Sequence, residues 1–281
     1  MTLTIAIIAP GEMGSAVGRR LREHGARITT SRAGRSKTSM ARADGAGFVI
    51  VERDERLVDD ADLLLSIVPP GEAPGVAERL APALKRAERK PIFVDCNAVA
   101  PVTAERIGAV LAATGCRYVD AGIIGPPPAG GLRTVFYVSG ENARDVLALN
   151  DYGLIVHALD GPIGAASALK MSYAGITKGL TAVGSAMMLG AERAGAGAAL
   201  KRELGESQPQ LLAYLSKHVP AMFPKAYRWV AEMEEIAQFL AADPAAPAIY
   251  AAVARLYARF AEGADTPERG ELAVLARFCK N

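Results

Sequence analysis

The stretch Leu3–Gly18, LTIAIIAPGEMGSAVG, decides the fold of the N-terminal part of the chain. Its apolar beginning, Leu3–Ile8, predicts a buried parallel strand. A turn with Gly11 and Gly14 follows, and then a helix with an apolar inner face. Strand, glycine turn and helix in this order are typical of a dinucleotide-binding fingerprint. We expect Gly11 to let the backbone approach a pyrophosphate and Gly14 to let the helix pack closely, while the helix N-terminus attracts the phosphates.

The turn departs from the usual fingerprint at its first glycine, because Ala9 and Pro10 stand there and give the pattern A-P-G-x-x-G. We still predict that this turn binds the phosphates of a dinucleotide. The predicted contacts are Pro10, Gly11, Glu12, Met13 and Gly14. The alternative is an ordinary α/β sheet that opens with a glycine-containing turn and binds no nucleotide.

Composition limits the class of protein. The chain has 281 residues, 51% of them hydrophobic, which suits one large or two moderate globular domains. The net charge of +2 favours neither nucleic acid nor an acidic membrane surface as a partner. Cys96, Cys116 and Cys279 show neither zinc spacing nor a disulfide framework, so we expect no metal and a reducing compartment.

The chain shows no pattern of export or of membrane insertion. No basic segment precedes the first strand, so the N-terminus does not resemble a signal peptide. The longest uncharged stretch of the second half, Gly179–Ala191, is too short and too rich in glycine to span a bilayer. We therefore expect a cytoplasmic protein.

Strands and helices alternate along the first half of the chain. The predicted strands are Leu3–Ile8, Ala26–Thr30, Gly47–Val51, Asp62–Val68, Pro91–Cys96, Arg117–Asp120, Thr134–Ser139 and Gly153–Ala158. The helices predicted after the first are Thr38–Asp44, Arg53–Ala61, Glu72–Arg89, Pro101–Thr114, Glu141–Leu149 and Ala165 to about Arg193, with a turn-rich segment over Gly122–Leu132. This alternation predicts an α/β fold with a doubly wound (Rossmann), mostly parallel sheet. No strand pattern follows Gly161, so we expect a dinucleotide-binding domain over residues 1–160 and an all-helical domain over residues 161–281.

The residues that follow the second strand bear on the choice of cofactor. A cofactor without a 2′-phosphate prefers a carboxylate there, to accept from the ribose hydroxyls. This chain has Ser31, Arg32, Arg35 and Ser36 instead, which would bind a 2′-phosphate through charge-assisted hydrogen bonds. We therefore predict NADP(H) rather than NAD(H), the alternative being a solvated basic loop without a ligand.

Two further strand ends are predicted to border the cofactor. Val68 and Pro69 end the fourth strand, and Pro69 would form a wall of the cleft. Asn97 follows the fifth strand, where the carboxyl ends of parallel strands face the ligand crevice.

Three segments together resemble the β-hydroxyacid dehydrogenase and 6-phosphogluconate dehydrogenase superfamily. They are the turn APGEMG, the segment VDAGIIG at Val119–Gly125 and the segment GPIGAASALKMSYAG at Gly161–Gly175. The later segment AYRWVAEMEEIAQFL, Ala226–Leu240, resembles a phosphogluconate dehydrogenase-like branch of that superfamily. The resemblance implies an oxidoreductase that transfers a hydride between a nicotinamide cofactor and a small substrate.

Lys170 is the catalytic residue that the resemblance implies. It is also a lone lysine among the small and apolar residues that begin a helix, where burial would lower its pKa. A neutral amine could take the alcohol proton as the hydride leaves, or the ammonium could return it in the reverse reaction. The alternative is a lysine whose amine reaches solvent along the helix surface.

The chain also departs from the superfamily where substrate would bind. Ala174 replaces an asparagine, Ile124 replaces a serine, and Thr177 replaces the glutamate of 6-phosphogluconate dehydrogenases. We therefore expect a more apolar pocket and an enzyme other than 6-phosphogluconate dehydrogenase. The residues predicted to line that pocket are Ile123, Ile124, Gly125, Tyr173, Thr177, Lys178 and Arg228. For Arg228, an ion pair with Glu232 one turn further along the helix is the simpler interpretation.

The function predicted from the sequence is an NADP(H)-dependent oxidoreductase acting on a small hydroxy acid or its carbonyl counterpart. One alternative is an imine- or opine-type reductase on the same scaffold, although an imine reductase of this fold usually replaces the lysine. A second alternative is a non-catalytic NADP(H)-binding regulator. Glycines over Gly175–Gly190 allow close helix contacts, which motivates a homodimer as a further hypothesis.

Overall fold

One sheet of eight strands organises the first part of the chain. The computed structural model describes residues 2–264 and 269–280. The strands are β1 (Thr4–Ile8), β2 (Arg27–Ser31), β3 (Val49–Val51), β4 (Leu63–Ser66), β5 (Ile92–Asp95), β6 (Arg117–Ile124), β7 (Val135–Ser139) and β8 (Ile155–Ala158). Their order across the sheet is β3-β2-β1-β4-β5-β6-β7-β8. Only the β6–β7 pair is antiparallel among these neighbours, so the sheet is mostly parallel, as the sequence predicts.

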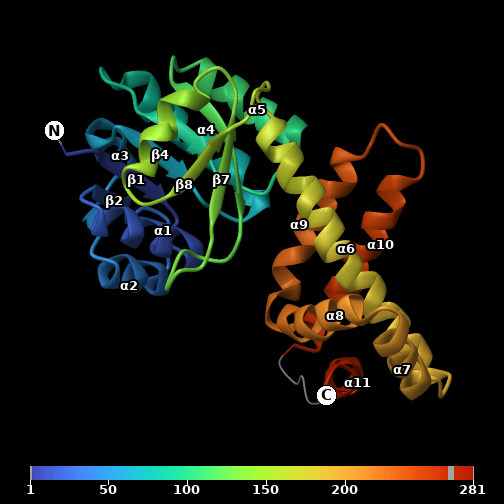
Figure 1. Ribbon diagram of the computed structural model, residues 1–281. Helices are drawn as coiled ribbons and strands as arrows, with labels where there is room; N and C mark the ends of the chain where they lie inside the picture. Colours follow the sequence, from blue (N-terminus) through green and yellow to red (C-terminus); the bar gives the residue numbers. More distant parts are fainter. Residues whose placement is uncertain (1, 265–268, 281) are drawn as a thin grey trace. The chain divides into compact units, whose positions relative to one another are not determined.

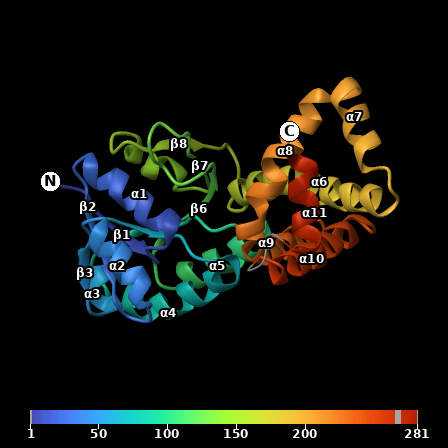
Figure 2. The same cartoon turned by 90° about the horizontal axis from the view of Figure 1, so that it is seen from below.

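Helices cover both faces of this sheet, because successive side chains of a strand point to opposite faces. In β1, Ile5 and Ile7 join the core that contains Val17 and Leu21 of the first helix. Ala6 and Ile8 join a second core with residues of the third to fifth helices. The helices are α1 (Glu12–Glu23), α2 (Lys37–Gly45), α3 (Asp54–Asp60), α4 (Ala73–Arg86) and α5 (Pro101–Ala112), with 3-10 turns η1 (Pro70–Glu72) and η2 (Ala143–Asn150). Figure 2 shows α1 on one side of the strands and α4 and α5 on the other.

Two predicted elements differ from the structure. The sixth strand was expected to end at Asp120 and to be followed by turns from Gly122, but β6 continues to Ile124. The reason is antiparallel pairing with β7, which extends the ladder to the pair Ile124 and Val135. The helix expected over Glu141–Leu149 is a 3-10 helix, η2.

The chain divides into two compact units, Met1–Met171 and Ser172–Asn281. Helix α6, Ala165–Arg193, runs through the division, so no break in secondary structure marks it (Figure 1). The domain boundary after residue 160 stays a prediction. The predicted second domain also includes positions 265–268 and 281, which lie outside the described residues.

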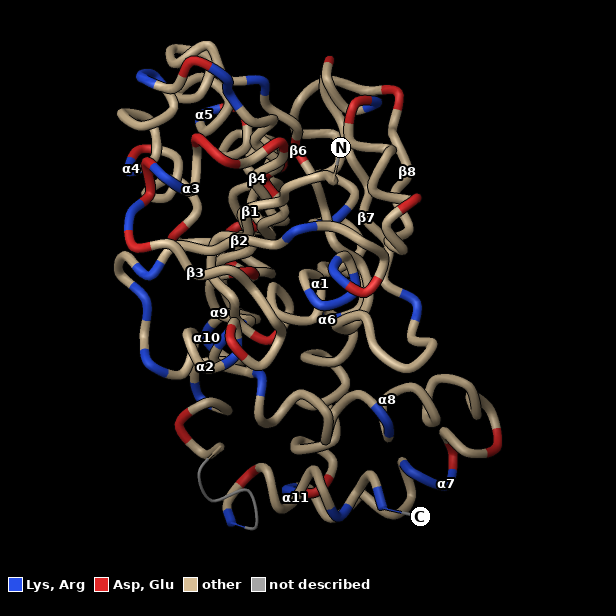
Figure 3. The backbone as a smooth tube through the Cα atoms, turned by 90° about the vertical axis from the view of Figure 1, so that its left-hand side faces the viewer, with Lys and Arg blue, Asp and Glu red and all other residues tan. Residues whose placement is uncertain are grey.

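The second unit is helical throughout its described residues, which agrees with the predicted fold class. Its further helices are α7 (Gly197–Ser207), α8 (Pro209–Met222), α9 (Ala226–Phe239), α10 (Ala246–Glu262) and α11 (Gly270–Cys279), with the 3-10 turn η3 (Phe223–Lys225). The α9 residues Met233 and Ile236 are buried together with Tyr257 of α10. Charged residues of both signs are interspersed along the helices of this unit, whereas β1 and β4 carry none (Figure 3).

Glycines of α6 are used for packing inside the second unit. A side chain at Gly184 would meet Leu215 of α8 at 2.5 Å, and one at Gly175 would meet the Tyr250 hydroxyl of α10 at 3.0 Å. Gly175 and Gly184 therefore serve contacts with the unit's own helices, whereas a Cβ added to Gly190 would meet nothing within 4 Å. The homodimer stays a prediction.

Candidate functional site

The turn after β1 is built around a left-handed residue. Ala9 has φ +62°, the one positive φ outside glycine among the described residues. The N–H of Gly11 donates to the Ala9 carbonyl at 2.7 Å, which closes a tight turn around Pro10. Gly14 then allows α1 to approach, because a Cβ there would lie 2.5 Å from the Ala9 oxygen and 3.3 Å from Ile7 Cγ2. The turn thus keeps the close helix–strand contact expected of the fingerprint, with alanine in place of the first glycine.

The start of α1 leaves room for a ligand beside its backbone. Gly11 is the N-cap and supplies no side chain, and a Cβ added to it would meet nothing within 4 Å. The first N–H groups of a helix have no partner inside that helix and, with the helix dipole, favour an anion. Glu12 is exposed, Met13 is half-buried and Pro10 is buried. The backbone here fits a pyrophosphate, because only main chain would stand between the helix and the phosphates.

The basic loop after β2 is held by its own side chains. Ser31 is buried, and its hydroxyl accepts from the N–H of Ala33 at 3.1 Å. The hydroxyl of Ser36 caps α2 by accepting from the N–H of Ser39 at 3.1 Å. Arg32 is exposed and forms an ion pair with Glu52 at 3.1 Å.

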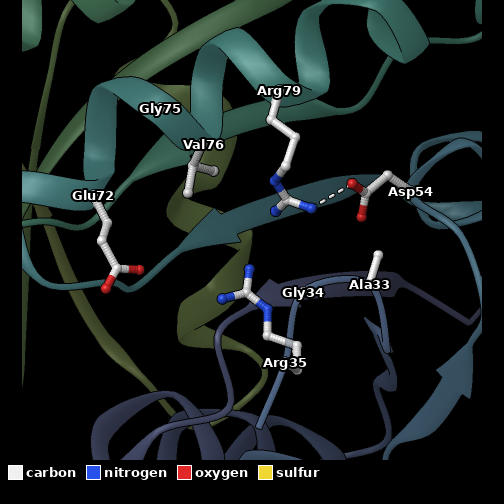
Figure 4. Close-up of a pocket in the computed structure, with 8 residues that line it drawn as sticks. All are labelled: Ala33, Gly34, Arg35, Asp54, Glu72, Gly75, Val76 and Arg79. Carbon is white, nitrogen blue, oxygen red and sulfur yellow. Dashed lines mark hydrogen bonds and ion pairs between the residues drawn. The ribbon is translucent and has the colours of Figure 1, made fainter.

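Arg35 instead lines a pocket of about 420 Å³ together with a second arginine, Arg79 of α4 (Figure 4). Arg79 forms an ion pair with Asp54, and Glu72 stands at the other end of the pocket. Burial and the neighbouring Arg79 charge both lower the pKa of Arg35. The carboxylates of Glu72 and Asp54 act on that pKa in the opposite sense. Guanidinium groups of this kind can bind a phosphate through charge-assisted hydrogen bonds.

The sequence did not point to Arg79 or Asp54. Arg79 is one of several charges on an amphipathic helix, and only the chain's folding brings it to the loop after β2. Oδ1 of Asp54 is buried and has no hydrogen-bond partner among the described residues.

Buried polar groups connect the ends of β4 and β5. The Asn97 amide nitrogen donates to Ser66 Oγ at 3.0 Å and to Asp95 Oδ1, while its oxygen accepts from the Val68 N–H at 2.6 Å. Burial, and secondly the nearby Asp120 charge, raise the pKa of Asp95 to about 7. Asn97 is buried and its amide is engaged within the protein, so a direct contact of this side chain with the cofactor stays a prediction. Pro69 is exposed beside buried Val68.

A second carboxylate, Asp120 of β6, holds the beginning of α6. Its Oδ2 accepts from the N–H groups of Gly164 and Ser167, both at 3.0 Å, and from the Ser139 hydroxyl at 3.0 Å. Its Oδ1 accepts from the Ser167 hydroxyl at 2.6 Å. The Ser139 oxygen in turn accepts from the N–H of Ala166 at 2.9 Å. The first turn of α6 is therefore bound to the β6–β7 pair.

Lys170 lies in the second turn of α6 and is half-buried. Its Cβ faces β6, because a Cβ added to Gly122 would come within 2.9 Å of both Lys170 Cβ and the Ala166 carbonyl. Glycine at position 122 thus lets the helix that carries Lys170 lie directly on the strand.

The predicted substrate residues of β6 differ in exposure. Ile123 is 8% exposed and belongs to the core on the α1 face of the sheet, whereas Ile124 is half-buried. Gly125 has φ +123°, and a Cβ there would lie 2.4 Å from the Arg133 carbonyl. Gly125 therefore serves the β6–β7 connection, and the substrate contacts of all three residues stay predictions.

The remaining predicted substrate residues lie in the second unit. Tyr173 is exposed, and the Thr177 hydroxyl donates to the Tyr173 carbonyl at 2.8 Å. Lys178 pairs with the buried carboxylate of Glu232 and lies 4.8 Å from the centre of the Trp229 ring.

Arg228 is exposed on α9, and its guanidinium lies 5.7 Å from the centre of the Tyr227 ring. Glu232, which we expected to pair with Arg228, also accepts a hydrogen bond from Lys178 of α6. A substrate contact of Arg228 stays a prediction.

No group of three or more His, Cys, Asp or Glu side chains suited to a metal ion occurs within residues 2–264 and 269–280. In the same residues, no helix has the length and apolar character needed to cross a bilayer.

A Rossmann sheet with a glycine turn open to phosphates defines the first unit as an NAD(P)-binding domain. The chain belongs to the family of the NAD binding domain of 6-phosphogluconate dehydrogenase, which residues 4–144 match. Residues 191–260 match a domain of unknown function, DUF1932.

Solved structures support the same fold over the whole chain. The conserved protein MTH1747, of unknown function and itself structurally similar to 3-hydroxyacid dehydrogenases, is 26% identical with a TM-score of 0.72, covering 95% of this chain and 100% of that one. The 3-hydroxyisobutyrate dehydrogenase of Mycobacterium tuberculosis is 20% identical with a TM-score of 0.76, covering 99% of both chains. An imine reductase of Myxococcus stipitatus, solved with NADP+, is 18% identical with a TM-score of 0.56, covering 99% of this chain and 100% of that one.

Proposed function

We propose that this protein is an NADP(H)-dependent oxidoreductase that interconverts a small hydroxy acid and its carbonyl counterpart, with Lys170 as general acid and base. The observation that carries the proposal is the placement of Lys170 on α6, directly over Gly122 of the strand next to β5. Family membership and the hydroxyacid dehydrogenase-like fold support the reaction class.

The residues divide the work as follows. The turn from Pro10 to Gly14 would hold the pyrophosphate, and the nicotinamide would accept or supply the hydride when bound. In the oxidative direction the Lys170 amine takes the proton of the substrate hydroxyl, while the hydride leaves the carbon atom that bears this hydroxyl. In the reductive direction the ammonium returns that proton to the oxygen.

The pocket of Arg35 and Arg79 favours NADP(H) over NAD(H) in this proposal. Two guanidinium groups suit a 2′-phosphate. Arg32, Ser31 and Ser36 were predicted for this role together with Arg35, yet each of these three has a partner within the protein.

The test of the proposed function is a turnover assay with NADP+ and a panel of small hydroxy acids, beginning with 3-hydroxyisobutyrate. Lys170→Met should reduce kcat by at least about a hundredfold, while NADPH affinity stays within about twofold of the parent. An unchanged rate in Lys170→Met would reject the catalytic role. Tight NADPH binding without turnover of any hydroxy acid or imine would instead favour the non-catalytic regulator.

An imine- or opine-type reductase is the second candidate. Imine reductases share the fold, and Ala174 stands where the superfamily resemblance implies an asparagine. Screening cyclic imines with NADPH beside the hydroxy acids separates the two reaction classes.

We also propose a homodimer in the cytoplasm, built on a face of α6 other than its glycines. Tyr173, Ile176, Leu180, Val183 and Met187 are exposed and recur at alternating spacings of three and four, the pattern of a helix–helix seam. Cytoplasmic location is supported by three cysteines that are all free and buried.

A further inference from the structure

We propose that Asp120 is a positioning residue, whose carboxylate fixes the start of α6 on β6 and thereby sets the location of Lys170. This inference rests on the proposed catalytic role of Lys170. It adds a residue that touches neither substrate nor cofactor but determines where the general acid and base stands.

The contacts of Asp120 are those of a helix cap supplied from another element. Its side chain is 1% exposed, and its two oxygens accept four hydrogen bonds. Two of the donors are backbone N–H groups at the beginning of α6, which have no partner within the helix itself. The Ser139 hydroxyl, which donates to this carboxylate, also accepts a hydrogen bond from the N–H of Ala166.

The same face of β6 provides a second point of attachment. Asp120 and Gly122 are two residues apart, so both face α6 while Ala121 faces away. Gly122 lies against Ala166 and Lys170, as the 2.9 Å approach of an added Cβ shows. Lys170 follows Ser167 by three residues and therefore lies on the same side of the helix. A helix attached at one turn and in contact at the next cannot rotate or slide without moving Lys170.

Burying an ionised carboxylate costs more free energy than burying an uncharged capping side chain, so the carboxylate at position 120 needs a physical reason. An ionised carboxylate only accepts hydrogen bonds, and all four contacts of Asp120 are of that kind. Burial, and secondly the Asp120 charge, raise the pKa of its neighbour across the ladder, Asp95, to about 7.

The test compares Asp120→Asn with Asp145→Asn. Asp145 is a half-exposed carboxylate that pairs with Arg117 at the beginning of β6, so its variant is the matched control. Hydrogen exchange of the amides over residues 164–171 and the rate of Lys170 acetylation by acetic anhydride are measured by mass spectrometry. Neither readout needs a substrate.

In Asp120→Asn we expect exchange at the start of α6 to rise about tenfold and Lys170 acetylation to change by at least about threefold. NADPH affinity should stay within about twofold, and exchange in β1 and β4 should not change. With a substrate in hand, kcat should fall about a hundredfold at a nearly constant KM. Asp145→Asn should alter none of these quantities.

Unchanged exchange and acetylation at α6 in folded Asp120→Asn would overturn the proposal, as would exchange that rises equally across the whole unit. If Asp120→Asn does not fold, Ser167→Ala removes only the contact to Oδ1 and should give smaller changes of the same kind; no change there would reject the inference. Failure of the proposed function would be seen separately, as full turnover in Lys170→Met with the Asp120 effects on exchange intact.

Discussion

Arg35 and Arg79 line the same pocket, although one follows strand β2 and the other lies on helix α4. Arg79 keeps an ion pair with Asp54 there, and Arg35 feels both the Arg79 charge and burial. The pocket holds these two guanidinium groups together with the carboxylates of Asp54 and Glu72. Its consequences for cofactor choice can be tested directly.

Arg79→Ala should weaken NADPH binding by about tenfold to a hundredfold, because a charge-assisted hydrogen bond to phosphate is lost. NADH, which lacks that phosphate, should lose less than about threefold. Titration of the fluorescence of the nicotinamide and of Trp229 measures both affinities. Arg86→Ala, on the same helix with an exposed partner in Glu55, is the control and should change neither. Equal losses of affinity for the two cofactors would show that Arg79 stabilises the fold without binding the 2′-phosphate.

Gly11→Ala and Gly14→Ala should separate cofactor binding from stability. The Gly11 variant adds a methyl group in open space at φ −70°, so its melting temperature should stay near that of the parent. The same methyl would occupy the place of the phosphates, and NADPH affinity should fall at least about tenfold.

Gly14→Ala places a Cβ 2.5 Å from a backbone oxygen and should cost about 1–3 kcal/mol in the free energy of unfolding. Thermal unfolding with and without NADPH measures both effects. Unimpaired cofactor binding by Gly11→Ala would argue against the proposed phosphate site.

Asp95 should make stability depend on pH in an unusual direction. Its carboxyl is neutral in the folded protein up to about pH 7, whereas its ordinary pKa is 3.8. Between these values the folded state holds a proton that the unfolded state releases, so rising pH reduces the free energy of unfolding by up to about 4 kcal/mol.

Asp95→Asn should remove that loss, so the variant should be more stable relative to the parent at pH 8 than at pH 4. Denaturant titrations at the two values measure the difference. Asp44→Asn, an exposed carboxylate, is the control. A parent protein whose stability does not fall across this window would contradict the assignment.

The exposed α6 seam predicts the oligomeric state. Sedimentation of the parent chain at micromolar concentration should show twice the 29.4 kDa of one chain. The double variant Ile176→Lys/Val183→Lys places two charges on the seam and should sediment as a monomer with unchanged helix content. Ile249→Lys changes an equally exposed apolar residue of α10 and should remain dimeric. A monomeric parent would reject the dimer, and a dimeric double variant would place its interface elsewhere.

The sequence predicted the sheet because buried strands leave continuous apolar runs, as in Leu63–Leu65, and most of them are followed by a helical pattern. It missed the second half of β6, because Ala121 and Gly122 are poor strand formers whose extended conformation depends on β7. A local sequence pattern predicts the conformation of its own segment, but it does not show which distant segment that one contacts in the fold.

The same limit applies to the candidate site. Lys170 was predicted from the resemblance to the superfamily and also stands out as a lone lysine, and the loop after β2 was predicted from its run of basic residues. Arg79 and Asp120 were not found, since each acts on a segment far away along the chain. Asp120 even lies in one of the quoted motifs, but nothing in the sequence shows that its oxygens bind the first turn of α6.

At Ala9 the turn keeps the backbone conformation expected of a dinucleotide-binding fingerprint, although an alanine replaces the first glycine. Its φ of +62° is the conformation that glycine adopts most readily, and alanine holds it at a cost of about 1–2 kcal/mol. A search for three glycines overlooks such a chain, whereas a search for one left-handed residue between a buried strand and a helix finds it. Nucleotide-binding turns of this kind are therefore better recognised from backbone geometry than from composition.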